Sequence, residues 1–331
     1  MARKNTKWAD PVDLAKDLSG KVYIVTGANS GVGLETTRQL VKQGAHVVMA
    51  CRRVEAGEAE AVSFADLHGS HEVIRCDLAD LQSVRDFIDA FKSRHTRLDG
   101  LMCNAGAVIM GSEAKRTKDG LEMTMAASVH GHFLMTELLL DVLKASAPSR
   151  IGIVSSVVHA NSPKKRYDLN FEDLNWETRK YSAFDAYGET KLAAVLYALE
   201  LGKRLEGTGV TTASIHPGWA RSNFGSGGGF FTHILMAIAR PLTRSMSDSN
   251  WASAQTSLHV LLSDDAPNHS GAYFSQSSVL YRDRECRDGG WPMESPYPNA
   301  RDLNKARRLV AHCAEAVGLT NETENNQGCP P

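Results

Sequence analysis

The stretch KVYIVTGANSGVGLETTRQL, residues 21–40, passes from a β-branched apolar segment through three glycines into a segment with helical spacing. Glycines at such a junction allow a tight turn in which backbone N–H groups and a helix N-terminus meet a pyrophosphate. A glycine cluster alone is a weak signal, but the strand–turn–helix context indicates a dinucleotide site. The residues expected at the phosphates are Gly27, Asn29, Ser30, Gly31, Val32 and Gly33.

Further short apolar segments alternate with longer segments of helical spacing along the chain. The apolar segments are residues 45–51, 71–78, 98–106, 149–156 and 210–218. The helical segments include residues 33–44, 81–95 and 122–145. Strict alternation predicts a parallel sheet covered by helices on both faces, which is a Rossmann-type doubly wound α/β fold.

Residues 21–319 are expected to form one domain, with an N-terminal extension at 1–20 and a flexible tail at 320–331. After Gly218 the alternation loosens, and residues 221–300 are expected to form a substrate-binding or lid region. A glycine-rich hinge, a helix and a strand are predicted within it, at 226–229, 250–262 and 271–275. Residues 302–319 read as a closing amphipathic helix.

The composition is that of a globular protein with no strong charge bias. Charged residues make up 23% of the chain and the formal net charge is −1, so nucleic acid is not expected as a partner. The six cysteines include no Cys-x-x-Cys pair, which argues against a zinc ribbon or a disulfide framework. No signal peptide or membrane-spanning run is recognisable, which predicts a cytoplasmic protein. The apolar segment 229–239 is too short to span a bilayer but suits contact with a membrane surface or an apolar pocket.

The end of the second predicted strand distinguishes the two nicotinamide cofactors. An NAD site usually offers a carboxylate to the ribose 2′-hydroxyl there, whereas an NADP site offers arginine to the 2′-phosphate. This chain has Arg52 and Arg53 at that point, and the first acidic residue is Glu55. The pattern favours NADP(H), although an arginine pair at a helix start can also be solvated surface.

The third and fourth predicted strands end in CDLAD and CNAG. Asp77 with the Leu78 backbone is placed to hydrogen-bond an adenine edge, while Asp77 or Asp80 can equally cap the following helix. In the second segment Asn104 is followed by the small residues Ala105 and Gly106, which allow the chain to pass close to a cofactor.

In DAYGETKLA, residues 185–193, Tyr187 and Lys191 are four apart in a predicted helix. Residues with this spacing share one helical face, so a phenol and an ammonium can address one bound molecule. The spacing alone is not specific, because a chain with eight tyrosines contains such a pair by chance about as often as not.

Taken together, these motifs resemble the classical short-chain dehydrogenases/reductases. TGANSGVG, CDL, NAG, VSS, YGETK and HPG stand in the order of that family over residues 20–218. The segments ACRR, GHFLMTELLL, RLEGTGVTTASIHPG and IARPLTRSM are similar to the branch of retinol dehydrogenases and WW-domain-containing oxidoreductases.

The resemblance implies roles for the catalytic residues. Tyr187 corresponds to the acid/base, Lys191 to its electrostatic partner and ribose ligand, and Ser156 to the hydroxyl that binds the reacting oxygen. Ser155 is the adjacent alternative, and strand alternation predicts that only one of the two serines faces the site. Near the nicotinamide and its phosphates, the resemblance places Pro217, Gly218, Trp219 and Ser222.

Two features depart from the pattern of the family. The relay asparagine, which holds a water on the proton path to the lysine, is replaced by Ser128. The loop at residues 162–184 is longer than in the smallest members, as in the retinoid-type branch. His130 and His132 near Ser128 lack an evident third ligand, so core or polar contacts are expected of them rather than a metal.

Three hypotheses of function follow. The first is an NADP(H)-dependent oxidoreductase that interconverts a carbonyl and an alcohol on an apolar substrate, such as a retinoid, a steroid or a lipid-derived aldehyde or ketone. The second is a cofactor-binding protein of low turnover that serves in interaction or redox sensing, for which Ser128 is the support. The third, an epimerase or dehydratase acting on a nucleotide sugar, is disfavoured by the NAG and HPG motifs. The helices of Ser128 and Tyr187 often pair in homodimers of the family.

Overall fold

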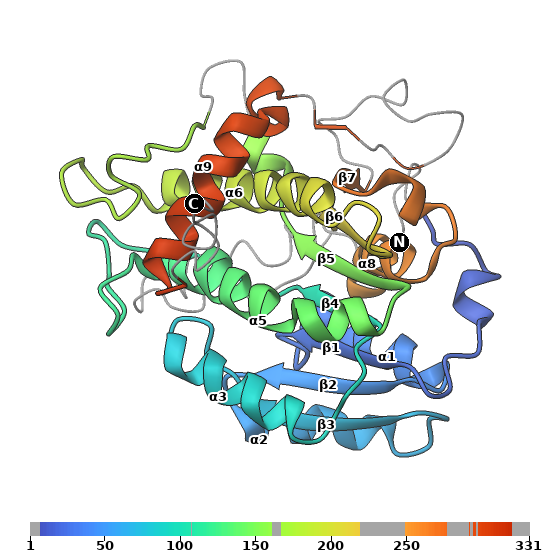
Figure 1. The fold of residues 1–331 in the computed structure, drawn as a ribbon. Coiled ribbons are helices and arrows are strands. Elements are labelled where there is room, and N and C mark those ends of the chain that lie inside the picture. The colour runs from blue at the N-terminus through green and yellow to red at the C-terminus, as the bar shows by residue number, and fades with distance from the viewer. Residues whose placement is uncertain are drawn as a thin grey trace, which may run out of the picture.

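The computed structural model describes residues 7–106, 108–160, 167–218, 249–276, 291, 294–295 and 297–319. Within them, parallel strands form one sheet in the order β3-β2-β1-β4-β5-β6-β7 (Figure 1). The strands are β1 (Val22–Thr26), β2 (His46–Cys51), β3 (Ser70–Arg75), β4 (Gly100–Cys103), β5 (Ser149–Val154), β6 (Val210–His216) and β7 (Ala272–Ser275). The strand order reverses between β1 and β4, and sheets of this kind bind ligands beyond the carboxyl ends of the strands at such a point. The predicted Rossmann-type fold is confirmed.

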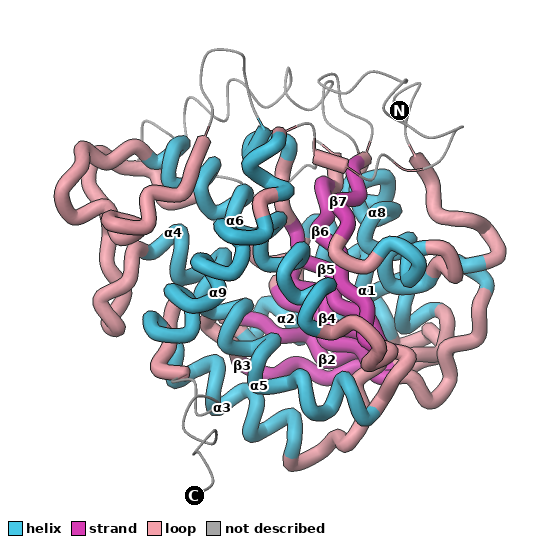
Figure 2. Tube along the Cα trace, turned by 45° about the horizontal axis from the view of Figure 1, so that its top comes forward, coloured by secondary structure: helices cyan, strands magenta, loops and turns pink. Residues whose placement is uncertain are grey.

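Helices cover both faces of this sheet. They are α1 (Gly31–Lys42), α2 (Val54–Ala61), α3 (Leu81–Lys92), α4 (Met123–Met125), α5 (Gly131–Ala145), α6 (Ala183–Arg204), α8 (Asn250–Leu262) and α9 (Leu303–Ala316). On one face Leu40 of α1 and Leu258 of α8 are fully buried in one apolar core. On the other face Phe87 of α3, Leu139 of α5 and Leu192 of α6 belong to a second core. Figure 2 shows the strands enclosed between these helices.

Helix α9 closes the second core from outside. It lies across α6 (Figure 1), and its Ala306, Leu309 and Cys313 are buried against the α3, α5 and α6 side of the sheet. The Asp302 carboxylate accepts hydrogen bonds from the backbone N–H groups of Asn304 and Lys305 and so caps the helix. The last described helix therefore completes a core that begins with the first strands.

The described part of the N-terminal extension packs onto the domain. The N–H of Ala9 donates to the Gln255 side chain at 3.2 Å, and the N–H of Lys7 donates to the Gln276 side chain at 2.6 Å. The Gln43 amide of the segment after α1 donates to the Asp13 carbonyl at 2.9 Å. Residues 7–20 therefore run along α8 and the end of α1. Among the described helices, none has the length and apolar character needed to cross a membrane.

Candidate active site

The glycine loop joins β1 to α1 at the carboxyl edge of the sheet. Gly27 and Gly31 have φ angles of 63° and 58°, in the left-handed region that favours glycine. A Cβ on Gly33 would lie 2.5 Å from both the Gly27 carbonyl oxygen and the Asn104 side chain, so only glycine lets α1 begin this close to β4. The loop geometry therefore requires glycine for reasons of space and of backbone conformation.

The first turn of α1 leaves backbone donors open toward this edge. Ser30 is the N-cap residue, and its side chain forms no capping hydrogen bond. The first N–H groups of a helix have no partner within the helix, so those of α1 can meet an anion. The buried Cys51 thiol accepts hydrogen bonds from the Asn29 and Ala28 backbone, and burial raises its pKa to about 11. These features fit the pyrophosphate of a dinucleotide, and the role of Cys51 in holding the loop was not predicted.

Arg52 and Arg53 follow the last residue of β2. Both side chains are exposed, and neither forms an ion pair or a side-chain hydrogen bond with any residue that the structure describes. Arg53 is the N-cap residue of α2, and Glu55 lies exposed in the first turn of that helix. A pair of unengaged guanidinium groups thus stands at the carboxyl end of β2.

The two aspartates in the segment after β3 form different hydrogen bonds. Asp80 caps α3, because its carboxylate accepts the Ser83 N–H at 3.0 Å. Asp77 is half-buried, and its carboxylate accepts the Ala79 N–H at 3.1 Å. A Cβ on Gly131 would lie 2.3 Å from the Leu78 carbonyl oxygen, so the start of α5 presses directly on this segment. Of the two candidates in the sequence, Asp80 is therefore the residue that caps α3.

A hydrogen-bond network joins β1 to the segment that contains Ser128. The Thr26 hydroxyl oxygen accepts the backbone N–H groups of Asn104 and Ala105, each at 2.9 Å. It also lies 2.9 Å from His132 Nε2, and His132 Nδ1 lies 3.1 Å from the Ser128 carbonyl oxygen. Burial lowers the pKa of His132 to about 4, so the ring is neutral near pH 7. Nδ1 must then donate to the carbonyl, and the Thr26 hydroxyl donates to Nε2.

The two candidate serines separate just beyond β5. The strand ends at Val154, and the Ser155 N–H donates to the Ile215 carbonyl of β6 at 2.6 Å, so the pairing of the two strands extends to Ser155. The Ser155 hydroxyl is buried and donates to the Lys191 carbonyl at 2.7 Å. The Ser156 hydroxyl instead forms a hydrogen bond with the Tyr187 hydroxyl. The structure thus pairs Ser156 with the tyrosine.

Tyr187 and Lys191 both lie on the inner side of α6. Burial raises the pKa of Tyr187, while the hydrogen bond from Ser156 acts in the opposite direction. The Lys191 ammonium donates to the Val154 carbonyl at 3.0 Å and lies 5.4 Å from the centre of the Tyr187 ring. Burial lowers the pKa of Lys191 from 10.5 to about 8. In the chain alone, burial therefore favours the protonated phenol of Tyr187 and the neutral amine of Lys191.

Ser128 lies in a π-helical turn, Ala126–His130, between α4 and α5. Its hydroxyl oxygen is buried and has no hydrogen-bond partner within the described chain. A Cβ on Gly106 would lie 3.7 Å from this oxygen and 3.4 Å from the Lys191 nitrogen. The missing side chain of Gly106 therefore leaves one point that both polar groups approach.

An apolar cluster surrounds Tyr187 and was not predicted from the sequence. Its buried members are Val108, Trp176, Tyr181, Ala183, Ala186 and Tyr187 itself, with Met110, Ala114 and Val158 against them. Four segments supply these side chains, namely the chain after β4, the turn after β5, the loop before α6 and the first turns of α6 itself. The cluster thus forms apolar surroundings for the phenol.

Side-chain contacts stabilise the described part of the loop predicted at 162–184. The last two residues of that predicted range already belong to α6, which begins at Ala183. Trp176 has a φ angle of 57°, which is strained for a residue with a side chain. The Arg179 guanidinium stacks 3.5 Å from the centre of the Trp176 ring and binds both oxygens of Glu189 at 2.6 and 2.7 Å. Arg116 donates to the carbonyls of Asn175 and Trp176. These contacts hold the strained conformation in place.

Two buried histidines lie close to Ser156 and Lys191. His159 Nδ1 donates to the Ser156 carbonyl at 2.5 Å, and Nε2 accepts from the Ser295 hydroxyl at 2.7 Å. Burial lowers the pKa of His159 to about 4 and that of His216 to about 3. From the sequence, His216 is identified only as part of the HPG motif, and His159 is not identified. Pro217 and Gly218 follow His216 half-buried, with a Gly218 φ of 83°.

Several predicted features lie outside the described residues. They are Trp219, Ser222, the hinge at 226–229, the apolar segment 229–239 and the tail at 320–331.

Known proteins similar to this chain are dehydrogenases. A family model described as short chain dehydrogenase matches residues 21–166. Human retinol dehydrogenase 13 is 37% identical over 95% of this chain and 89% of its own length. Human retinol dehydrogenase 12 is 40% identical over 91% of this chain and 88% of its own length. Among solved structures, an uncharacterized protein from Mycobacterium Paratuberculosis covers 92% of this chain and is covered to 96%, with a TM-score of 0.70 and 29% identity.

The family establishes the general chemistry, which is hydride transfer between a nicotinamide cofactor and a CH–OH group. The structure supplies the corresponding glycine loop at the switch point of the sheet and the tyrosine–lysine pair on α6. The chain belongs to the short-chain dehydrogenase/reductase family, in its retinol dehydrogenase-like branch.

Proposed function

We propose that the protein is an NADP(H)-dependent oxidoreductase that interconverts a carbonyl and an alcohol on an apolar substrate. The proposal rests on the surroundings of the Tyr187 hydroxyl. This group is hydrogen-bonded to Ser156 within an apolar cluster, and the Lys191 ammonium is buried beside the tyrosine. A proton donor, a second hydroxyl and a cation thus meet at one point.

The preference for NADP(H) is supported by Arg52 and Arg53. Exposed guanidinium groups with no partner in the described chain are free to bind the 2′-phosphate. The position that holds a carboxylate in NAD sites is occupied here by these cations. The glycine loop would hold the pyrophosphate, and the Asp77 and Leu78 segment would border the adenine.

The roles of the catalytic residues follow from their protonation. The nicotinamide, when bound, supplies or takes the hydride. In reduction, Tyr187 gives its proton to the alkoxide oxygen that develops on the substrate, and the Ser156 hydroxyl donates a hydrogen bond to the same oxygen. Burial keeps the Tyr187 phenol protonated in the chain alone, which suits a proton donor. Lys191 then stabilises the phenolate by its charge.

Ser128 is the proposed relay group. Its buried hydroxyl and the Lys191 ammonium approach the same point beside Gly106, where a water molecule can accept from one and donate to the other. After Tyr187 has given up its proton, Lys191 can return a proton to the phenolate and in turn take one from this water. Serine is shorter than asparagine, so the water takes over part of the distance.

The apolar cluster around Tyr187 supports an apolar substrate. Val108, Met110 and Trp176 offer no ion-pairing group to a ligand at the phenol. The names of the relatives called retinol dehydrogenase give them an apolar substrate of this kind. Retinoids, steroids and lipid-derived aldehydes or ketones are accordingly the proposed class of substrate.

A pairing of two copies through α5 and α6 stays a prediction, and α9 already covers part of α6. A cytoplasmic location also stays a prediction.

The test is turnover of NADPH with a panel of apolar aldehydes and ketones, followed by nicotinamide absorbance. We expect Tyr187→Phe to lower kcat by at least ~10²-fold, the lower range for loss of a general acid. Tyr197→Phe is the matched control, because this buried tyrosine lies on the same helix and bonds Glu137 outside the site. Tight NADPH binding without turnover of any substrate would contradict the proposal and favour the hypothesis of a cofactor-binding protein.

A further inference from the structure

Three metal-ligating side chains meet at the amino edge of the sheet, away from the catalytic residues. His46 is the first residue of β2, Glu72 lies in β3, and His95 follows the end of α3. All three are partly buried, with side chains exposed by 26%, 20% and 18%. Arg52 follows the opposite end of β2, about 20 Å along the strand at ~3.3 Å per residue. The cluster is therefore separate from the proposed cofactor site.

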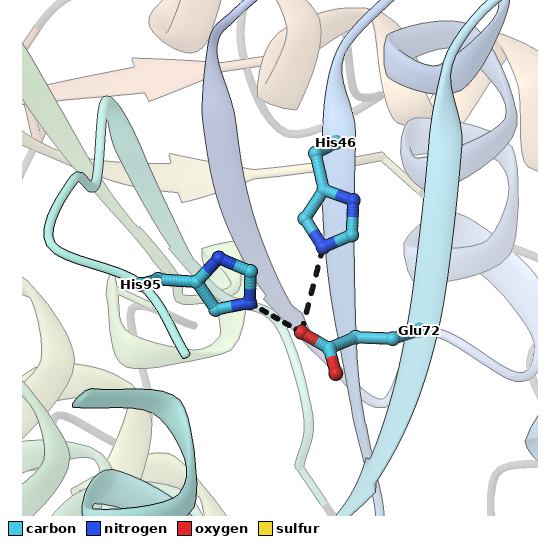
Figure 3. Close-up of side chains that lie close together, drawn as sticks. All are labelled: His46, Glu72 and His95. Carbon is cyan, nitrogen blue, oxygen red and sulfur yellow. Dashed lines mark hydrogen bonds and ion pairs between the residues drawn. The ribbon is translucent and has the colours of Figure 1, made fainter. Parts of the chain in front are cut away.

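Figure 3 shows both imidazole rings directed at one oxygen of the Glu72 carboxylate. His95 Nε2 lies 2.5 Å from Glu72 Oε1, and His46 Nε2 lies 3.4 Å from the same oxygen. The three ligand atoms lie within 4.8 Å of one another. Tetrahedral zinc with bonds of about 2.0–2.2 Å requires separations of roughly 3.3 Å between its ligand atoms. Side-chain movements of about 1 Å therefore reach a binding geometry.

Further side chains orient His46 and Glu72. The Ser70 hydroxyl lies 2.7 Å from His46 Nδ1. A serine hydroxyl can donate or accept a hydrogen bond, so it can accept one from the Nδ1–H of His46 when Nε2 binds a metal. Arg94 binds Glu72 Oε2 at 2.6 Å and leaves Oε1 directed toward the rings. Ligating histidines and carboxylates in metal sites are usually held by hydrogen bonds of this kind.

We propose that His46, Glu72 and His95 form a binding site for a divalent transition metal of the zinc class. Two imidazole nitrogens and one carboxylate oxygen are a ligand set that zinc uses, with a fourth position left to water. The ion would link β2, β3 and the end of α3, and so stabilise the half of the sheet that carries Arg52. The proposal does not depend on the proposed enzymatic function.

The simpler alternative is that the histidines only hydrogen-bond the carboxylate. The two cases separate when the full chain, freed of metal with EDTA, is titrated with ZnSO4 by calorimetry and followed by thermal unfolding. We expect one zinc per chain and, at zinc about 100 times its Kd, a rise in Tm of roughly 5 °C.

Matched variants identify the ligands. His46→Gln and His95→Gln should each weaken zinc binding at least tenfold, and either variant alone suffices if the other does not fold by circular dichroism. His68→Gln is the control, because His68 is an exposed histidine in the loop just before β3. Absence of stoichiometric binding, or equal affinity in all of these proteins, would overturn the site.

Discussion

At the nucleotide end of the proposed cofactor site, the first turn of α1 presents backbone N–H groups, and Arg52 and Arg53 present exposed guanidiniums with no side-chain partner among the described residues. At the proposed catalytic end, Tyr187 and Lys191 are buried. Burial raises the pKa of Tyr187 and lowers that of Lys191, so it favours the neutral form of each. One end is therefore ready to bind charge at little cost to the fold. The other holds functional groups that burial penalises, so changes there should affect stability and activity in opposite directions.

Acid should act most strongly on the catalytic end. Burial lowers the pKa to about 3 for His130 and His216 and to about 4 for His132 and His159. The unfolded chain binds these protons near pH 6.5 and the folded chain does not, so stability is present above pH 6.5 and is lost as the pH falls toward 4. Each histidine contributes up to ~1.4 kcal/mol per pH unit in this window, and the four together up to ~5 kcal/mol per pH unit.

Urea unfolding between pH 7 and 4.5, followed by tryptophan fluorescence, measures this slope. The variant His216→Gln should flatten it by about a quarter if the four contribute equally. A free energy of unfolding that stays constant over the same range would show that these rings are not buried neutral, and the contrast between the two ends would fail.

Lys191→Met separates function from stability at the catalytic end. Loss of the ammonium should lower kcat by ~10²-fold or more, since the charge no longer supports the phenolate. The shift of its pKa from 10.5 to about 8 corresponds to a penalty of ~3 kcal/mol on the buried charge. Replacement by an apolar side chain of similar length should therefore raise Tm in a thermal melt. A lower Tm would mean that the bond to Val154 stabilises the ammonium by more than burial costs.

The double variant Arg52→Ala with Arg53→Ala tests the nucleotide end. We expect KM for NADPH to rise about 10- to 100-fold, which corresponds to the loss of charge-assisted bonds worth ~1.5–3 kcal/mol. KM for NADH and the free energy of unfolding should hardly change, because the exposed arginines have no partner in the described chain. Equal use of NADPH and NADH by the unmodified protein would refute the assigned preference.

The smallest effect is expected at Ser128. Ser128→Ala should lower kcat a few-fold at most if other water routes to Lys191 exist, while Ser128→Asn should raise it if serine limits the relay. Gly106→Ala is the sharper probe, since a methyl group there would lie 3.7 Å from the Ser128 oxygen and displace a bridging water. A rate in Gly106→Ala equal to that of the unmodified protein, measured by NADPH absorbance, would speak against a relay along this path.

The features predicted well from the sequence are those that depend on local chemistry. Gly27, Gly31 and Gly33 lie in one turn, and the positions of the strands follow from short apolar segments, so the fold could be read directly. The bond between His159 and Ser295 joins residues 136 apart, and the His46, Glu72 and His95 cluster spans two strands and a helix end. Such contacts depend on tertiary packing, which no spacing reveals.

The choice between Ser155 and Ser156 shows the same limit at close range. Both serines stand in one motif, yet their hydroxyls meet different partners, the Lys191 carbonyl for Ser155 and Tyr187 for Ser156. The backbone direction after the strand decided which hydroxyl met Tyr187. Likewise, the sequence identified Lys191 but not its lowered pKa, which depends on how completely the surrounding helices exclude water.

Helix α9 has a consequence for biosynthesis. Ala306, Leu309 and Cys313 belong to the same core as Leu101 and Ile151, so this core lacks its outer cover until the last described helix has been synthesised. A chain terminated before residue 303 would expose the apolar side of α6 that α9 covers. Exposed patches of this kind favour aggregation. Premature termination near the C-terminus should therefore yield an aggregation-prone protein, even though every residue of the tyrosine–lysine pair and of the glycine loop would be present.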